Sequence, residues 1–269
     1  MLLGMLCMAQ AKDRIVERPP FLAQNSSSIE IDKIVMSDTV TTVYIKAFYR
    51  PKYWIKIATG SVLKDNNGIL YPIRKGIGIT LDKEFWMPES GEAEFQLTFP
   101  PIPQNVTRLD FSEGDFEGAY KIWGIQLDKK SFGKFKLPKD VIVPKADHKM
   151  TLPDPIVKYD KAILKGRILD YQKGMPDKGS LYYQDVIRDG AQEGKIRIQD
   201  DGTFYHEMNV FMITPCTIMF PFGTIEYLLA PGETTSIVIN LRENARKQSH
   251  LRQAEKPYGK EVYYGGYLA

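Results

Sequence analysis

Short runs of alternating apolar and polar residues constrain this chain more than any other feature of its sequence. Turn residues separate the runs about every ten positions. In the first half the runs lie at residues 28–35, 41–49, 53–58, 76–81, 93–99, 106–111 and 119–127. Between two runs, Asp65-Asn66-Asn67-Gly68 forms a hairpin-turn signal, because Asn-Gly readily adopts the positive φ that such turns need. This rhythm predicts an all-β sandwich or barrel.

A proline-containing stretch interrupts this rhythm in the middle of the chain. Pro138, Pro144, Pro153 and Pro155 stand among lysines and aspartates, and proline cannot pair into a central strand. Strand patterns then resume at residues 162–170, 181–187, 195–199, 203–210, 216–220, 225–229 and 234–240. We therefore expect two β-sandwich domains, at residues 28–130 and 161–240, joined by a linker at residues 131–160.

The pattern changes again after residue 240. Asn240 is suited to cap a helix, and Glu243 follows at the capping-box spacing. The sequence predicts a short helix ending near Ala254, within a C-terminal segment of residues 241–269 whose end resembles the start of another element. Lysines and arginines outnumber glutamates here, which indicates either a solvated connecting helix, the favoured interpretation, or a surface for an acidic partner.

The N-terminal segment, residues 1–27, begins with an apolar run that ends in Ala9-Gln10-Ala11. This pattern is typical of a signal-peptide cleavage site, so we expect export to the periplasm or cell envelope. A frayed apolar terminus and a lipid anchor on Cys7, which would tether the chain to a membrane, are the alternatives. No later run reaches the ~18 apolar residues of a membrane span. A net charge of +3 is too small to indicate a nucleic-acid partner.

Motifs of catalysis are missing from the sequence. It contains no HExxH, CxxC or GxSxG, and Gly76-Ile77-Gly78 opens no helix. The acidic clusters at residues 89–94 and 110–117 are expected to be solvated turns, and His206 is expected to face solvent. Cys216 has no neighbour that would stabilise a thiolate, which predicts a buried structural thiol. We expect no catalytic residue, metal or cofactor, and no enzymatic activity of this chain.

Aromatic residues of the first domain are the remaining candidates for a binding site. They are Tyr53, Trp54, Trp86 and Trp123. Exposed, they would form a platform for glycans or peptides. Large aromatics more often fill β-sandwich cores, and a core position is the favoured interpretation.

Several motifs together resemble a known family. They are YWIKI (53–57), WMPESG (86–91), FQLTFPPIP (95–103), KIWGIQL (121–127), LKGRI (164–168), QDDGTF (199–204) and YLLAPGET (227–234). From about residue 28 onward the chain resembles the N-terminal β-domain region of TlpA-type thiol-disulfide oxidoreductases of the Gram-negative cell envelope. The last two motifs also occur in many prealbumin-like sandwiches. The resemblance implies an Ig-like first domain and a prealbumin-like second one.

In that family a thioredoxin domain with a Cys-x-x-Cys pair follows the β domains. This chain has no such pair, so no catalytic residue can be carried over. The resemblance implies a non-catalytic, two-domain part that positions a catalytic thioredoxin domain outside this chain or binds a protein partner. The alternative is a stand-alone envelope module that binds glycans or peptides.

Overall fold

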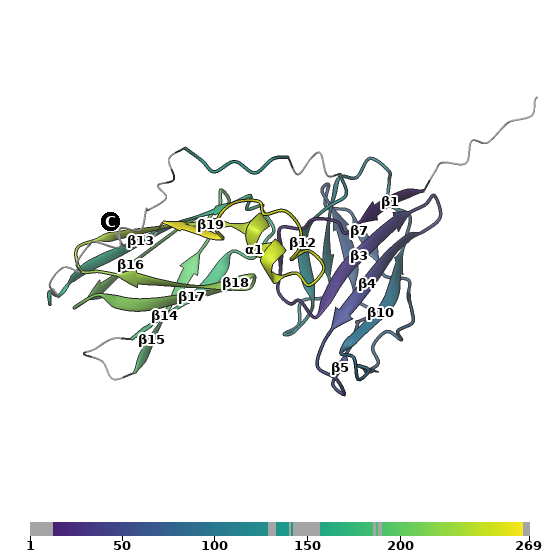
Figure 1. Cartoon of the computed structure of the whole chain (residues 1–269), viewed down its shortest axis with the longest axis horizontal. Coiled ribbons are helices and arrows are strands. Elements are labelled where there is room, and N and C mark those ends of the chain that lie inside the picture. The colour runs from purple at the N-terminus through teal and green to yellow at the C-terminus, as the bar shows by residue number, and fades with distance from the viewer. Residues whose placement is uncertain are drawn as a thin grey trace, which may run out of the picture. The chain divides into compact units, whose positions relative to one another are not determined.

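The computed structural model describes residues 13–128, 133–139, 141, 157–184, 187 and 190–265 (Figure 1). The apolar N-terminal run with Cys7 and most of the expected linker lie outside these residues. The described chain forms two compact units. One contains residues up to Pro20 and from Ser26 to Asp128, and the other contains Phe21–Asn25 and the residues from Gly133 on. Apart from one short helix, the regular elements of the described residues are strands, which confirms the all-β prediction.

The first unit contains two sheets. One has the order β1-β3-β4-β10-β8 and the other contains β12-β11-β6-β7. The bounds of the first sheet are β1 (Arg14–Glu17), β3 (Ile29–Met36), β4 (Thr41–Phe48), β10 (Glu92–Phe99) and β8 (Lys75–Ile77). Those of the second are β12 (Lys121–Gln126), β11 (Arg108–Ser112), β6 (Val62–Asp65) and β7 (Leu70–Pro72). A separate two-stranded ribbon pairs β5 (Trp54–Ile55) with β9 (Phe85–Trp86).

Side-chain alternation gives each of these sheets an apolar face. In β4, Val43, Ile45 and Ala47 are buried while the residues between them are partly exposed, and β11 alternates in the same way at Leu109 and Phe111. Because successive side chains of a strand point to opposite faces, each sheet buries one face. Two such sheets bury their apolar faces against each other in a sandwich.

The predicted Asn-Gly turn joins β6 to β7. Gly68 has a φ of 86°, where an L side chain would be strained. The Asp65 carboxylate accepts hydrogen bonds from the backbone N–H groups of Asn67 (2.8 Å) and Ile69 (2.9 Å). Asp65 also accepts one from the hydroxyl of Tyr71 at 3.1 Å. The hairpin prediction at this position is confirmed.

The first domain begins before residue 28, where we expected it to start. β1 pairs with β3 from Arg14 opposite Met36 to Glu17 opposite Lys33. The Arg14 guanidinium donates to the carbonyls of Gln104, Val106 and Leu127 at 2.7–2.8 Å. These bonds tie β1 to two distant segments, and alternation alone could not indicate them. The two-residue β2 (Ala23–Gln24) follows β1 in the sequence and belongs to the residues grouped with the second unit.

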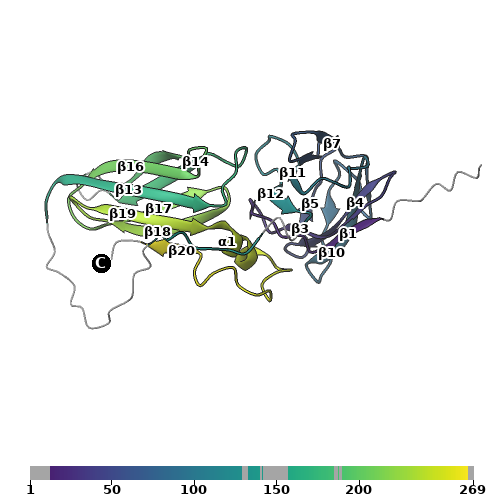
Figure 2. The same ribbon diagram turned by 90° about the horizontal axis from the view of Figure 1, so that it is seen from above.

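The second unit is built from two four-stranded sheets, in the orders β16-β13-β19-β20 and β15-β14-β17-β18. The first contains β16 (Thr203–Val210), β13 (Asp160–Leu169), β19 (Thr234–Asn240) and β20 (Tyr263–Gly265). The second contains β15 (Ala191–Arg197), β14 (Lys178–Gln184), β17 (Thr214–Phe220) and β18 (Gly223–Leu229). Figures 1 and 2 both show β13 between β16 and β19, parallel to β19. The rings of Phe204 and Phe220, one from each sheet, lie 5.5 Å apart in the core.

Two local features complete this unit. Pro231-Gly232 forms a turn, with Gly232 at a φ of 80°, and the turn leads from β18 to β19, which belong to different sheets. The end of the C-terminal segment does begin another element, as the sequence predicts: the strand β20, which pairs with β19 of the same unit, Tyr263 opposite Ile239.

The helix α1 (Leu241–Gln248) begins where the sequence predicts. The Asn240 side chain accepts a hydrogen bond from the backbone N–H of Glu243. The helix ends at Gln248, before the expected Ala254, because Ser249 adopts an extended conformation. The basic residues of this segment were expected to be solvated or to contact an acidic partner. Arg242 and Arg246 do neither, because they form internal ion pairs with Asp170 and Glu243 at 2.7 Å. The Ig-like and prealbumin-like assignments of the two units stay predictions.

Candidate functional site

Two tryptophans stand directly opposite each other on the β5–β9 ribbon. Trp54 pairs with Trp86 and Ile55 with Phe85 in antiparallel register. Trp54 is 44% exposed and Trp86 is 60% exposed. Directly opposite residues of a ribbon project to the same face, with Cβ atoms about 5 Å apart. The fold therefore presents both tryptophan side chains to solvent from facing positions of one ribbon.

Alternation along the ribbon explains why these rings face outward. Ile55 and Met87, the neighbours of the two tryptophans, are both buried. Phe85 packs against Phe95 of β10, with ring centroids 6.2 Å apart. Since Ile55, Phe85 and Met87 anchor the ribbon to the core, the tryptophans must occupy its other face.

The backbone on either side of the ribbon extends its pairing. The N–H of Met87 donates to the carbonyl of Tyr53 at 2.8 Å, and the N–H of Tyr49 donates to the carbonyl of Gly91 at 2.9 Å. Gly91 has a φ of 71°, and a Cβ there would come within 2.8 Å of the Tyr49 carbonyl oxygen. These hydrogen bonds fix the backbone conformation on either side of the two tryptophans.

Two tyrosines accompany the tryptophans at one end of the ribbon. Tyr49 and Tyr53 are exposed and meet edge to face, with ring centroids 6.2 Å apart. The guanidinium of Arg50 lies 5.8 Å from the centre of the Tyr53 ring, within the range of a cation–π contact. We call the exposed set Tyr49, Tyr53, Trp54 and Trp86 the aromatic ribbon.

The structure divides the four aromatics that the sequence indicated. The expectation of a core position is wrong for Tyr53, Trp54 and Trp86, which lie in the aromatic ribbon. It holds for Trp123 of β12, which is 8% exposed and leaves the candidate set. Tyr49 is the member that sequence reasoning missed. Its position at the end of the long strand pattern 41–49 gave no sign that it would meet Tyr53.

The polar rim of the aromatic ribbon carries charges of both signs. Lys52 Nζ lies 3.1 Å from Glu89 Oε1, with both side chains largely exposed, so the pair contributes little to stability. Such groups are free to exchange water for the hydroxyls or amides of a ligand. The arrangement suits binding; it contains no nucleophile paired with a base.

Two members of the acidic cluster at residues 110–117, Asp110 and Glu113, serve the fold. Asp110 accepts a hydrogen bond from the N–H of Gly124 at 2.8 Å, while Asp115 is exposed, as expected, and pairs with Lys121 at 2.8 Å. Glu113 is buried, which corrects the expectation of a solvated turn, and it accepts from the N–H groups of Ala58 and Tyr120. Burial raises its pKa despite these bonds. Among the described residues, no group of three or more His, Cys, Asp or Glu is arranged to hold a metal ion.

His206 differs from its prediction too. It shares the inner face of β16 with Phe204 and Met208, and its ring lies 3.3 Å from the position that a Cβ on Gly194 would occupy. Burial lowers the pKa of His206, so the folded protein favours its neutral form. Its surroundings indicate a packing role.

Cys216 lies in the core of the second unit. The thiol is 2% exposed on β17, and its partner in register across β18 is the buried Tyr227. Burial raises the pKa of Cys216 to about 12, so the thiolate is scarce near neutral pH. The structure supports a packing role for this residue.

This burial predicts slow labelling. In a Cys7→Ser variant, Cys216 will react with a disulfide-exchange reagent at neutral pH at the rate at which the second unit opens. It will react at once when the chain is unfolded in denaturant. The absorbance of the released thiolate measures both rates. Rapid modification of the folded chain would contradict a buried, un-ionised thiol.

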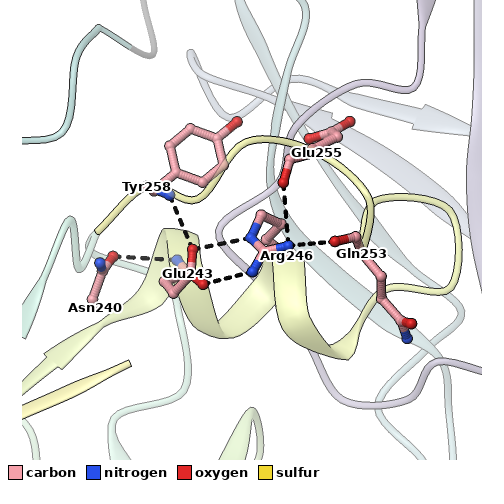
Figure 3. Close-up of polar contacts among 6 residues, drawn as sticks. All are labelled: Asn240, Glu243, Arg246, Gln253, Glu255 and Tyr258. Atoms are coloured by element: carbon pink, nitrogen blue, oxygen red, sulfur yellow. Dashed lines mark hydrogen bonds and ion pairs between the residues drawn. The ribbon is translucent and has the colours of Figure 1, made fainter. Parts of the chain in front are cut away.

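A buried polar network joins α1 to the loop that follows it (Figure 3). The Glu243 carboxylate accepts two bonds from Arg246, at 2.7 and 3.0 Å, and one from the backbone N–H of Tyr258 at 3.0 Å. Arg246 also donates to the carbonyls of Gln253 and Glu255. Glu243 and Arg246 are almost fully buried, so the network fixes the loop and exposes no reactive group.

The described residues contain no helix that is long and apolar enough to span a membrane. They form an all-β, two-unit protein whose β5–β9 ribbon exposes two tryptophans.

Known proteins show little similarity to this chain. No protein-family model matches the chain, and no curated protein matches it. Among solved structures, pullulanase type I from Bacillus subtilis str. 168 complexed with maltose aligns at 8% identity and a TM-score of 0.28, over 75% of this chain and 24% of the pullulanase.

Two further solved structures are similarly distant. A pullulanase from Anoxybacillus sp. LM18-11 complexed with maltotriose aligns at 11% identity and a TM-score of 0.27, over 71% of this chain and 24% of the other. The Bacillus anthracis TIE protein aligns at 9% identity and a TM-score of 0.21, over 85% and 40%. The chain spans about a quarter of the length of each of these two pullulanases.

Proposed function

We propose that this chain is a binding module and that Trp54 and Trp86 form its platform for a glycan. The observation that carries the proposal is the register that sets the two exposed tryptophans directly opposite each other. Contiguous apolar surface that stays exposed on a soluble unit typically marks a binding surface. Hydrogen bonds also fix the backbone on which the two tryptophans stand, so the backbone loses little conformational entropy on binding.

The chemistry of the aromatic ribbon fits a sugar. A pyranose ring has an apolar C–H face that can stack on an indole, and its hydroxyls need hydrogen-bond partners around that face. Arg50, Lys52 and Glu89 supply donors and acceptors at the rim. A peptide that added itself as a strand would need a free strand edge, and β5 and β9 are only two residues long. The ribbon therefore favours a glycan.

The test is binding to an array of glycans, followed by titration of the best ligand. Trp54→Ala and Trp86→Ala should each weaken that ligand at least about tenfold, or 1.4 kcal/mol, because each removes one stacking face. Phe116→Ala is the matched control, since it removes another exposed aromatic of the same unit and should leave the affinity unchanged. All three changes are at exposed positions, so the melting temperature should stay near that of the wild type.

Two results would refute this proposal. One is an array without a bound glycan. The other is a glycan whose affinity is the same for both tryptophan variants and the wild type. In either case the exposed tryptophans would have no part in glycan binding.

The resemblance to TlpA-type oxidoreductases supports a second hypothesis, a non-catalytic part that positions a thioredoxin domain or binds a protein partner. None of the comparisons tests it, and it stays a prediction, as do export to the cell envelope and the lack of enzymatic activity. A gene that encodes a thioredoxin domain with a Cys-x-x-Cys pair after Ala269 would favour it. The aromatic ribbon could serve such a protein as its binding surface.

A further inference from the structure

A hollow of ≈ 540 Å³ lies on the second unit, in the sheet that contains β14, β15 and β17. Its volume falls within the range of small-molecule sites. We call it the basic hollow, after the residues that line it: Lys178, Gly179, Ser180, Lys195, Ile196, Arg197, Met219, Phe220 and Pro221.

Strand register explains why three cations converge there. Lys178 stands opposite Arg197, and Ser180 stands opposite Lys195. Residues two apart on one strand share a face, so all four side chains project from the same outer face of the sheet. Met219 of β17, opposite Ser180, extends this face and is 50% exposed.

The positive charge of the basic hollow is only partly neutralised. Among the described residues, Lys178 and Lys195 form no ion pair. Arg197 is mostly exposed and lies 3.8 Å from the nearest carboxylate oxygen of Asp177, too long for a hydrogen bond. Glu193 is the other acidic neighbour, and it accepts a weak 3.5 Å bond from the Ser180 hydroxyl. Three cations against two carboxylates favour an anionic ligand.

The base of the basic hollow is apolar. Ile196 and Phe220 are buried beneath it. Gly179 leaves room for Phe220, since a Cβ on this glycine would come within 2.7 Å of the Phe220 ring. Met219 and the methylene stems of the lysines line the sides, as long basic side chains commonly do. An apolar surface thus lies beside positively charged groups.

We propose that the basic hollow binds a small organic anion that combines an apolar body with one carboxylate. The carboxylate pairs with Lys195 and Arg197, and the apolar body covers Met219. The proposal is independent of the aromatic ribbon, which belongs to the other unit, and either site can fail without the other.

Octanoate is a suitable probe, titrated into the full chain at low salt and followed by amide chemical shifts. We expect saturable binding with a dissociation constant on the order of 1 mM and shifts confined to β14, β15 and β17. A Lys195→Gln/Arg197→Gln variant should weaken octanoate at least about tenfold. Neutral 1-octanol should bind at least about tenfold more weakly than octanoate, because it lacks the carboxylate. Acetate should show no saturation, because it lacks the apolar body.

Lys165→Gln/Lys173→Gln is the matched control. It also removes two positive charges, but from exposed positions of the same unit that lie outside the basic hollow. The octanoate affinity should therefore change less than about twofold. An equal loss in both double variants would show a general charge effect and overturn the proposal. Three other results would also overturn the proposal: octanol that binds as tightly as octanoate, octanoate binding that does not saturate, and chemical-shift changes at amides outside the basic hollow.

Discussion

Replacing Glu243 with alanine will lower the free energy of unfolding of the second unit by about 3–5 kcal/mol. The carboxylate is 1% exposed and accepts three hydrogen bonds, two of them from Arg246. Its removal leaves the buried Arg246 guanidinium without its counter-charge. The N–H of Tyr258 loses its acceptor in the same step, so the loop that covers α1 loosens as well.

Urea denaturation, followed by circular dichroism and tyrosine fluorescence, measures this change. Lys247→Gln is the matched control, since it removes an exposed charge one position from Arg246 and should change stability by less than about 0.5 kcal/mol. A Glu243→Leu/Arg246→Met double variant should be more stable than Glu243→Ala, because neither charge is left buried alone. A Glu243→Ala protein within about 1 kcal/mol of the wild type would show that the network does not hold the loop.

The same network predicts a dependence of stability on pH. Burial alone would raise the pKa of Glu243, but the hydrogen bonds from Arg246 and Tyr258, together with the charge of Arg246, lower it on balance. A carboxyl whose pKa is lower in the folded state stabilises the protein above its ordinary pKa of 4.5, and this stabilisation is lost as the pH falls through the folded value. The Glu243→Ala variant should lack this part of the acid-induced loss.

Alanine at Gly166 is expected to destabilise the second unit by about 3 kcal/mol or more, the upper range for overpacking. Gly166 lies in β13 opposite Phe204 of β16. A Cβ there would stand 1.8 Å from Cζ of the Phe204 ring. The ring is buried against Phe220, so it can move only by displacing the core.

The midpoint of urea unfolding tests this expectation. Gly60→Ala is the control in the first unit, since its nearest atom would be 3.9 Å from the new Cβ, and it should leave stability nearly unchanged. A Gly166→Ala/Phe204→Leu double variant should be less destabilised than the sum of its two single changes, because the smaller side chain removes the clash. Additive losses in the double variant, or a Gly166→Ala protein as stable as the wild type, would contradict the predicted contact.

Local sequence patterns were sufficient for much of this fold. The Asn66-Asn67-Gly68 turn and the Asn240 cap depend on residues within a few positions of each other. The packing of Cys216 followed from its apolar neighbours. The residue at which α1 ends could not be predicted from such local patterns. It depends on Ser249 and on side-chain hydrogen bonds to residues far beyond the last turn. Arg14 is a similar case, since its three acceptors lie some ninety or more positions away.

The candidate binding residues show most clearly the difference between what local sequence predicts and what distant contacts decide. The sequence by itself determined that the chain is all-β and that Tyr53, Trp54, Trp86 and Trp123 lie in or beside strands, because alternation and turn chemistry are local properties. Only the tertiary structure decided that Trp123 is buried while Trp54 and Trp86 are exposed. A strand of two residues contains no period from which to read its inner face. The pairing of Trp54 with Trp86 comes from the way the ribbon docks on the core through Ile55 and Met87.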